Sequence, residues 1–274
     1  MAVDLNGSNQ YFTKTVSLFS GTSTSYNWTL VAWCRPDDRH EGTMIGADQG
    51  TGSNGRFSLF SRNVGRFALR RKSGFIQEPS ASYSNGNTDW FHVAGTWRYA
   101  YRELYVDGAS RVTQSSNISL DPAKATNFYI GRDHSGKYWN GKLAECAAYS
   151  VILTAAEIAT LAAGFSPLFV RPDKLIGYWP LGGTLTAATS GDDVTGTDGD
   201  LTAFNSPAKF SQPYQVWPTA QQNIIYPLAP APIIPGQGHD YAVPDSLLDY
   251  ASNSRSDYTT PRQAADYGVP SDGT

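Results

Sequence analysis

Short runs of apolar and aromatic residues, separated by turn-forming residues, recur from Tyr11 to Tyr149. Their aromatic and β-branched content is typical of strands, and the Gly, Asn and Asp residues between them are typical of turns. The pattern predicts strands at 29–35, 56–60, 66–71, 90–97, 103–108, 127–131 and 141–149. Such a series of short strands indicates an all-β domain.

Two turns between these segments can be assigned. Asn63-Val64-Gly65 predicts a short hairpin loop between the strands at 56–60 and 66–71. Asp107-Gly108 predicts a two-residue hairpin loop, because Asp-Gly readily adopts the positive φ angles of a type I′ turn.

One short helix is expected after the last strand. Thr154 is the predicted N-cap, and Glu157 stands three residues later in capping-box position. Ile158 and Leu161 supply the apolar stripe, and Gly164 fits the left-handed position that follows a helix. This helix closes a β domain and does not belong to a βαβ series.

Five blocks carry a family resemblance: DLNGSNQYF (4–12), WTLVAWCRPD (28–37), WFHVAGTW with RELYVDG (90–97 and 102–108), YIGRD (129–133) and the segment 138–164. Their order and spacing resemble the laminin-G-like branch of the concanavalin A-like lectin/glucanase superfamily. The resemblance covers residues 4–164 and implies a jelly-roll sandwich of two curved antiparallel sheets with one concave face. Residues 166–183 resemble an extension attached to such domains in bacteriophage and environmental bacterial proteins.

The composition divides the chain into three parts. Residues 1–183 are the expected sandwich with its closing extension, and 184–206 are a Gly/Thr/Asp-rich loop or weak strand pair. Residues 207–274 hold 10 of the 16 prolines and are expected to form an extended, acidic tail. Asp-Tyr recurs in this tail, and its tyrosines either attach the tail to a partner or reflect composition alone: Tyr241, Tyr250, Tyr258 and Tyr267.

Composition and charge exclude several classes of protein. Hydrophobic residues make up 40% of the chain and aromatic residues 13%, which is enough for a core and excludes global disorder. No apolar run approaches the length of a membrane span, and the start lacks the features of a secretory signal. Residues 1–183 carry 18 Lys+Arg against 14 Asp+Glu (+4), and 184–274 carry 3 against 10 (−7). These opposite charges suggest that the tail binds a neighbouring copy or an underlying shell in an oligomeric assembly.

Cysteine is scarce. Cys34 and Cys146 are too few for a disulfide scaffold or a cysteine zinc site. Each lies in an apolar strand context, which favours two buried free thiols, while a disulfide between them stays open.

The sequence does not support catalysis. Glycoside hydrolases need two carboxyl groups at a set separation, and the glucanases that the chain resembles place theirs at alternate positions of one strand, where side chains share a face. None of the five glutamates has an acidic neighbour two residues away: Glu41, Glu78, Glu103, Glu145 and Glu157. His92 is expected to pack within its strand, and no nucleophile elbow, Walker loop or zinc-protease motif occurs. We therefore expect a protein that is not an enzyme.

Residues that could bind a sugar gather in TWRYAYR (96–102) and RDHSGKYWN (132–140). Aromatic rings stack on sugar faces and polar groups fix the hydroxyls, so the candidates are Trp97, Tyr99, Tyr101, Arg132, His134, Tyr138 and Trp139. The first three alternate and would share a strand face if the strand continues. The alternative is that these aromatic residues belong to the core or to an interface.

Calcium is the one cofactor that the sequence allows. The resemblance implies it, because related lectin-like sandwiches bind calcium at loop rims through oxygen ligands. Asp48 and Asp133 lie in Gly-rich loops and are the candidate ligands. Aspartates in such loops also serve as turn formers, so both interpretations stay open.

Six basic residues fall within 17 positions without an acid between them: Arg56, Arg62, Arg66, Arg70, Arg71 and Lys72. Two hairpin strands would display them as one patch, which is either a solvated sheet face or a dock for the acidic tail of a second copy. The domain is not basic overall, so nucleic-acid binding is not expected.

Three functional hypotheses follow. The first is a non-enzymatic structural or decoration protein of a phage virion, which displays the lectin-like jelly roll and binds host glycans with multivalent avidity. The second is a secreted or cell-surface bacterial carbohydrate-binding or adhesion module. The third, remote hypothesis is a glucan hydrolase.

Overall fold

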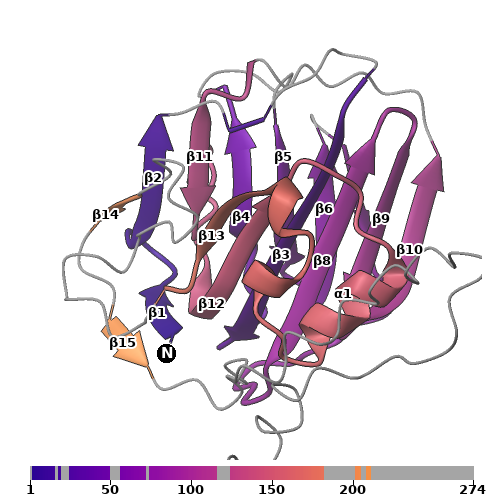
Figure 1. Cartoon of the computed structure of the whole chain (residues 1–274). Coiled ribbons are helices and arrows are strands. Elements are labelled where there is room, and N and C mark those ends of the chain that lie inside the picture. The colour runs from indigo at the N-terminus through magenta and orange to yellow at the C-terminus, as the bar shows by residue number, and fades with distance from the viewer. Residues whose placement is uncertain are drawn as a thin grey trace, which may run out of the picture. The chain divides into compact units, whose positions relative to one another are not determined.

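The computed structural model describes residues 2–15, 18–19, 25–49, 56–71, 74–115, 124–181, 201–204 and 208–210. Within these residues, strands form two antiparallel sheets, one of eight strands and one of seven, which pack face to face (Figure 1). The prediction of an all-β sandwich is confirmed, and the architecture is consistent with a jelly roll. No helix in this part of the chain is long and apolar enough to cross a membrane.

The eight-stranded sheet, sheet A, is built around its long strand β12. The strand order is β10-β9-β8-β3-β12-β1-β15, and β13 also pairs with β12 (Figure 1). One edge of β12 pairs with β1 along 140–143 and with β13 along 146–149. The strands of sheet A are β1 (Ala2–Asn6), β3 (Asn27–Pro36), β8 (Phe91–Arg98), β9 (Tyr101–Val106), β10 (Ala109–Ser115), β12 (Asn140–Tyr149), β13 (Leu175–Trp179) and β15 (Ala208–Phe210).

The seven-stranded sheet, sheet B, has the order β14-β2-β11-β4-β5-β6-β7. Its strands are β2 (Tyr11–Thr15), β4 (Gly42–Asp48), β5 (Phe57–Arg62), β6 (Arg66–Arg71), β7 (Gly74–Gln77), β11 (Asn127–Ile130) and β14 (Thr202–Phe204). β14 and β15 are close in sequence but do not pair with each other. Each extends a different sheet, because β14 pairs with β2 and β15 pairs with β1.

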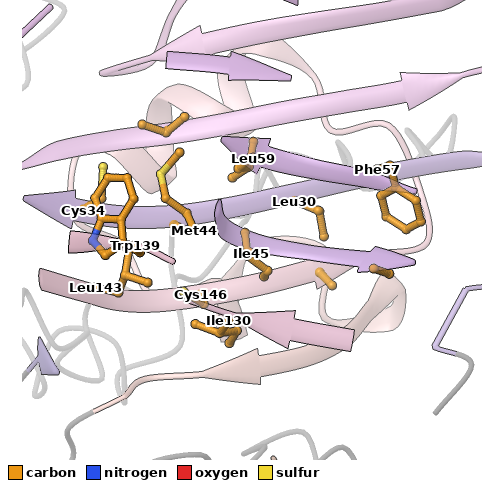
Figure 2. Close-up of a cluster of buried hydrophobic side chains, with 14 of the residues drawn as sticks. Leu30, Cys34, Met44, Ile45, Phe57, Leu59, Ile130, Trp139, Leu143 and Cys146 are labelled. Atoms are coloured by element: carbon orange, nitrogen blue, oxygen red, sulfur yellow. The ribbon is translucent and has the colours of Figure 1, made fainter. Parts of the chain in front are cut away.

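A hydrophobic core that contains many aromatic rings fills the space between the two sheets, and Figure 2 shows part of its side chains. Alternate residues of each strand point inward, so Trp28 and Cys34 of β3 are both buried in it. Ring contacts cross from sheet to sheet: Trp28 stacks on Phe57 with centroids 4.8 Å apart, and Trp179 stacks on Phe128 with centroids 4.6 Å apart. Both cysteines are buried and free, as expected, and burial raises the pKa of both thiols.

A second, smaller apolar cluster covers the outer face of sheet A. Helix α1 (Ala155–Ala162) and the 3-10 helices η2 (Pro167–Phe169) and η3 (Pro172–Lys174) follow β12 (Figure 1). The cluster joins side chains of this segment to outward-facing residues of sheet A, among them Ile158, Leu161, Val170, Val31, Ala94 and Tyr149. The helical segment therefore packs against the outer face of sheet A. Polar and aromatic side chains occupy the outer face of sheet B.

The strands, turns and helix that were predicted from local sequence signals are present in the structure. The seven predicted strands correspond to β3, β5, β6, β8, β9, β11 and β12, with ends that differ by at most two residues. Gly65 has a φ angle of 75°, and Asp107 and Gly108 have φ angles of 51° and 77°, which confirms both hairpin turns. Helix α1 begins after Thr154 with both bonds of the capping box present, and Gly164 has a φ angle of 95°.

Replacing the helix cap should weaken the fold by a measurable amount. Thr154 Oγ1 accepts a hydrogen bond from the Glu157 backbone N–H at 3.3 Å, so Thr154→Ala should lower the free energy of unfolding by about 1 kcal/mol in urea titration. Thr160→Ala makes the same chemical change inside the helix, where alanine is favoured, and should not destabilise the protein. Equal stability of the Thr154→Ala variant and the unmodified protein would contradict the role of the cap.

Candidate functional site

The outer face of sheet B brings polar and aromatic groups together. In β11, Phe128 enters the core, so the next residue, Tyr129, points outward. The strand register continues this outward row through Gly46 of β4 and across β5 to Arg70 of β6. The loop 131–139, between β11 and β12, contacts the same row through side chains described below.

Arg132 lies in a tyrosine cage formed by Tyr11, Tyr129 and Tyr138. Its guanidinium carbon is 4.3 Å from the ring centroid of Tyr11, 5.3 Å from that of Tyr129 and 5.6 Å from that of Tyr138. Tyr11 and Tyr138 also contact each other, with centroids 5.9 Å apart. Each of these distances lies within the range of a cation–π interaction or an aromatic pair. The cage therefore holds a cation between ring faces at the edge of solvent.

His134 connects the loop to two strands of sheet B. Asp48, at the end of β4, accepts hydrogen bonds from the His134 backbone N–H at 3.2 Å and from Nδ1 at 3.0 Å. The guanidinium of Arg56, next to β5, contacts the same ring. The imidazole of His134 therefore lies between the carboxylate of Asp48 and the guanidinium of Arg56. Burial lowers the pKa of Arg56.

Asp133 is enclosed by hydrogen-bond donors. Its Oδ1 accepts from the backbone N–H of Ser135 at 2.9 Å, from the Ser135 hydroxyl at 2.9 Å and from the backbone N–H of Lys137 at 3.1 Å. Its Oδ2 forms an ion pair with Arg70, whose guanidinium lies 4.1 Å from the Phe60 ring centroid. Asp133 therefore fixes the loop to sheet B.

This arrangement does not fit the calcium site suggested for Asp48 and Asp133. Calcium needs six to eight oxygen ligands, whereas both oxygens of Asp133 face N–H or O–H donors. In the described part of the chain, no group of three or more His, Cys, Asp or Glu side chains could hold a metal ion.

Two of the candidate aromatic residues are buried, which corrects the expectation that they stack on a sugar. Trp97 of β8 has 0% of its surface exposed, and Trp139, at the end of the loop, has 1%. Both belong to the core between the sheets, and Figure 2 labels Trp139 among its side chains. Inward-facing strand positions take the largest apolar rings, so neither indole reaches the outer surface.

Trp97, Tyr99 and Tyr101 do not share a strand face, because the strand does not continue. Tyr99 and Ala100 form the turn of the β8–β9 hairpin, in which Ala100 has a φ angle of 64°. Tyr101 lies opposite Arg98 in β8, and the Arg98 guanidinium is 4.6 Å from the Tyr101 ring centroid. These two tyrosines belong to sheet A, whereas Arg132, His134 and Tyr138 gather on sheet B.

The basic run is divided between the two faces of sheet B, so it is not displayed as one continuous patch. Strand alternation sends Arg70 outward to Asp133 and its neighbour Arg71 inward, where Arg71 is 0% exposed and donates to the Tyr26 hydroxyl at 3.0 Å. Arg62 is paired with Glu41. Lys72 lies outside the described residues, as do the four tail tyrosines Tyr241, Tyr250, Tyr258 and Tyr267.

Several residues of the site were not among the predicted site residues, and they include Tyr11, Tyr129, Arg56 and Arg70. Tyr129 follows Phe128 in a predicted strand, and this alternation was a usable signal for an outward-facing ring. Tyr11 reaches the cage only through the pairing of β2 with β11, which places Thr13 opposite Tyr129. That pairing joins strands far apart in the sequence and leaves no local signal.

The two antiparallel sheets and the aromatic, hydrogen-bonding face of sheet B define a lectin-like β-sandwich. The chain belongs to the concanavalin A-like lectin/glucanases superfamily, since the Laminin_G_3 family matches residues 6–159, more than half of the chain. No curated protein sequence matches the chain.

Several solved structures align with this chain at low sequence identity. A candidate carbohydrate-binding protein from Bacteroides ovatus aligns with a TM-score of 0.53 and 19% identity, covering 76% of this chain and 60% of that one. The CBM40 module of Ruminococcus gnavus IT-sialidase, bound to α2,3-sialyllactose, aligns with a TM-score of 0.48 and 14% identity, covering 59% and 95%. Domain 4 of AbnA, an extracellular arabinanase from Geobacillus stearothermophilus, in complex with arabinotriose, aligns with a TM-score of 0.47 and 16% identity, covering 59% and 76%.

His92 is buried in sheet A, as the sequence indicated. It has 1% of its surface exposed and contacts Trp33 with ring centroids 5.5 Å apart. Burial lowers the pKa of His92 to about 3, so the side chain is neutral in the folded protein. Its Nδ1 has no hydrogen-bond partner among the described residues. These properties are those of a packed sheet residue.

The buried neutral histidine should make the fold sensitive to acid. Below the pKa of about 6.5 of an unfolded histidine, the unfolded chain binds a proton that folded His92 does not, so stability falls as the pH drops towards 3. Between pH 7.5 and 4.5, urea unfolding of the unmodified protein should lose about 2 to 3 kcal/mol more than His92→Gln loses. The same pH dependence in both proteins would show that His92 does not couple folding to protonation.

Proposed function

We propose that this protein is a non-catalytic carbohydrate-binding domain whose site is the outer face of sheet B. The observation that carries the proposal is the tyrosine cage around Arg132, because it places aromatic faces beside hydrogen-bond donors. Membership of the lectin/glucanase superfamily supports a sugar as the ligand. The similar fold of the candidate carbohydrate-binding protein from Bacteroides ovatus is in keeping with this proposal.

The cage and the loop offer the two kinds of contact that a sugar requires. Tyr11 and Tyr138 are partly exposed, so their rings can pack against the C–H face of a sugar ring. Arg132, His134 and Lys137 lie around them, and their N–H groups can donate to hydroxyl oxygens. A site with apolar faces and a few fixed polar groups is typical of small-ligand recognition.

Contacts of the nearby carboxylates favour binding without hydrolysis. Asp133 and Asp48 accept hydrogen bonds from the surrounding loop. Glu41 pairs with Arg62 and with Lys137, the latter at 2.8 Å. Burial acts to raise the pKa of Glu41, but the hydrogen bond from Lys137 and the charge of Arg62 outweigh it and lower the pKa. A glycosidase acid needs the opposite shift, because it must hold a proton at neutral pH.

Removing one ring of the cage should weaken sugar binding. The full chain is applied to a glycan array, and the affinity for the best ligand is then measured by calorimetry. Tyr138→Ala should weaken binding about tenfold or more, because it deletes an aromatic face of the site. Tyr99→Ala is the matched control, since Tyr99 is 38% exposed in the hairpin turn of sheet A and should leave binding unchanged.

Two results would contradict this assignment. Loss of binding in Tyr99→Ala but not in Tyr138→Ala would place the site at the β8–β9 hairpin. Absence of binding to every glycan at high protein concentration would refute a carbohydrate-binding function.

We also propose that the domain is displayed on a phage particle and attached through its C-terminal residues. The support comes from the sequence: residues 166–183 resemble an extension of such domains in bacteriophage and environmental bacterial proteins, and 207–274 is rich in proline, acidic residues and Asp-Tyr pairs. The alternative setting is a bacterial surface, where the same domain acts in adhesion.

Truncation tests this setting separately from sugar binding. Deleting 211–274 leaves every described strand in place, so glycan affinity should persist while incorporation into particles, measured by co-sedimentation, is lost. Unchanged incorporation of the truncated protein would overturn the role proposed for the tail.

A further inference from the structure

Arg132 differs from Arg70 and Lys137 because it has no acidic partner among the described residues. Its Nε donates to the backbone carbonyl oxygen of Asp133 at 3.0 Å, and none of the described carboxylates pairs with its guanidinium. Arg70, in contrast, is paired with Asp133, and Lys137 is paired with Glu41. An arginine carries five N–H donors, and the four on the terminal nitrogens of Arg132 have no acceptor among the residues that the structure describes.

The tyrosine cage fixes this guanidinium in place. The three ring centroids lie 4.3, 5.3 and 5.6 Å from its central carbon. Tyr129 is only 8% exposed, and burial, with the charge of Asp48, raises its pKa to about 12, so the ring stays neutral. A guanidinium held against rings has lost much of its freedom before a ligand arrives, which favours tight binding.

The charge balance of this face also favours an anion. Among the charged side chains described above for this face, the cations outnumber the anions by two. The cations are Arg56, Arg62, Arg70, Arg132 and Lys137, and the anions are Glu41, Asp48 and Asp133. Arg56 has no acidic partner among the described residues either, and its Nε is buried without a hydrogen bond. An excess of positive charge attracts anionic ligands and disfavours cationic ones.

From these observations we infer that Arg132 binds the carboxylate of an acidic sugar, whose ring packs against Tyr138. The inference rests on the proposed carbohydrate-binding function and specifies its ligand class. A planar carboxylate accepts two parallel hydrogen bonds from a guanidinium, and such charge-assisted pairs are about twice as strong as neutral ones. A neutral sugar can engage the ring faces, and its hydroxyl groups can accept hydrogen bonds, but it lacks the charge that strengthens the contact with the guanidinium.

Matched glycans test the carboxylate directly. The full chain is titrated with oligosaccharides that end in a uronic acid or in a sialic acid, and with the same oligosaccharides after reduction of the carboxyl group to an alcohol. The unreduced form of the preferred sugar should bind about tenfold or more tightly than its reduced form. The two acid types share the recognised group, and the stronger binder identifies the source of the carboxylate.

Variants of Arg132 link that preference to the guanidinium. Arg132→Gln should abolish the difference between the acidic and reduced sugars, and Arg132→Lys should restore only part of it, because an ammonium lacks the two-pronged geometry. Arg98→Gln is the matched control, since Arg98 also lies over a tyrosine, at 4.6 Å from the Tyr101 centroid, but in sheet A. The melting temperatures of all three variants report whether the fold is retained.

The outcomes separate this inference from the proposed function. Equal binding of acidic and reduced sugars, or a preference that persists in a folded Arg132→Gln variant, overturns the role of Arg132 while carbohydrate binding stands. Binding to no sugar of either kind overturns both. A preference that Arg132→Gln removes and Arg98→Gln retains supports the inference.

Discussion

The aromatic core between the sheets determines which residues can form the site. Side chains of a strand alternate between its two faces, so a residue that enters the core forces its neighbours outward. Phe128 takes the inward position in β11 and thereby turns Tyr129 to the outer face. In β6 the same rule sends Arg71 inward and Arg70 outward. The outer face of sheet B is thus set by the packing of rings on its other side.

Asp133 fixes the position of the loop 131–139 relative to sheet B. The ion pair with Arg70 joins the loop to β6, and the bonds to the backbone N–H groups of Ser135 and Lys137 close the turn itself. Asp133 is only 3% exposed, and a buried charge needs such complete pairing to be tolerated. Arg132 and His134 flank this residue, so their positions over sheet B follow from the same anchor. The position of the cage therefore depends on the strands of sheet B and on the fully hydrogen-bonded carboxylate of Asp133.

Local features of the fold were predictable, while features that depend on pairing over long distances were not. The strands, the Asp107-Gly108 turn and the Thr154 cap are each encoded within a few adjacent residues. β14 and β15 have three residues each, too few for a periodic signal, and exist through their pairing with β2 and β1. The turn at Tyr99–Ala100 contains no glycine, so nothing in its sequence marks the end of β8. At the site, Arg132, His134 and Tyr138 were predicted because they are close in sequence.

Tryptophan and tyrosine differ in how readily they are buried, and this difference explains why the sugar-binding rings were only partly predicted from the sequence. Four tryptophans are among the largest fully buried side chains: Trp28, Trp97, Trp139 and Trp179. An indole has a large apolar surface and a single N–H donor, which suits the space between two sheets. A tyrosine hydroxyl both donates and accepts hydrogen bonds, so the ring tolerates a position that is half apolar and half wet. In this sandwich these four tryptophans therefore help to hold the two sheets together, while Tyr11 and Tyr138 form part of the surface that can meet a ligand.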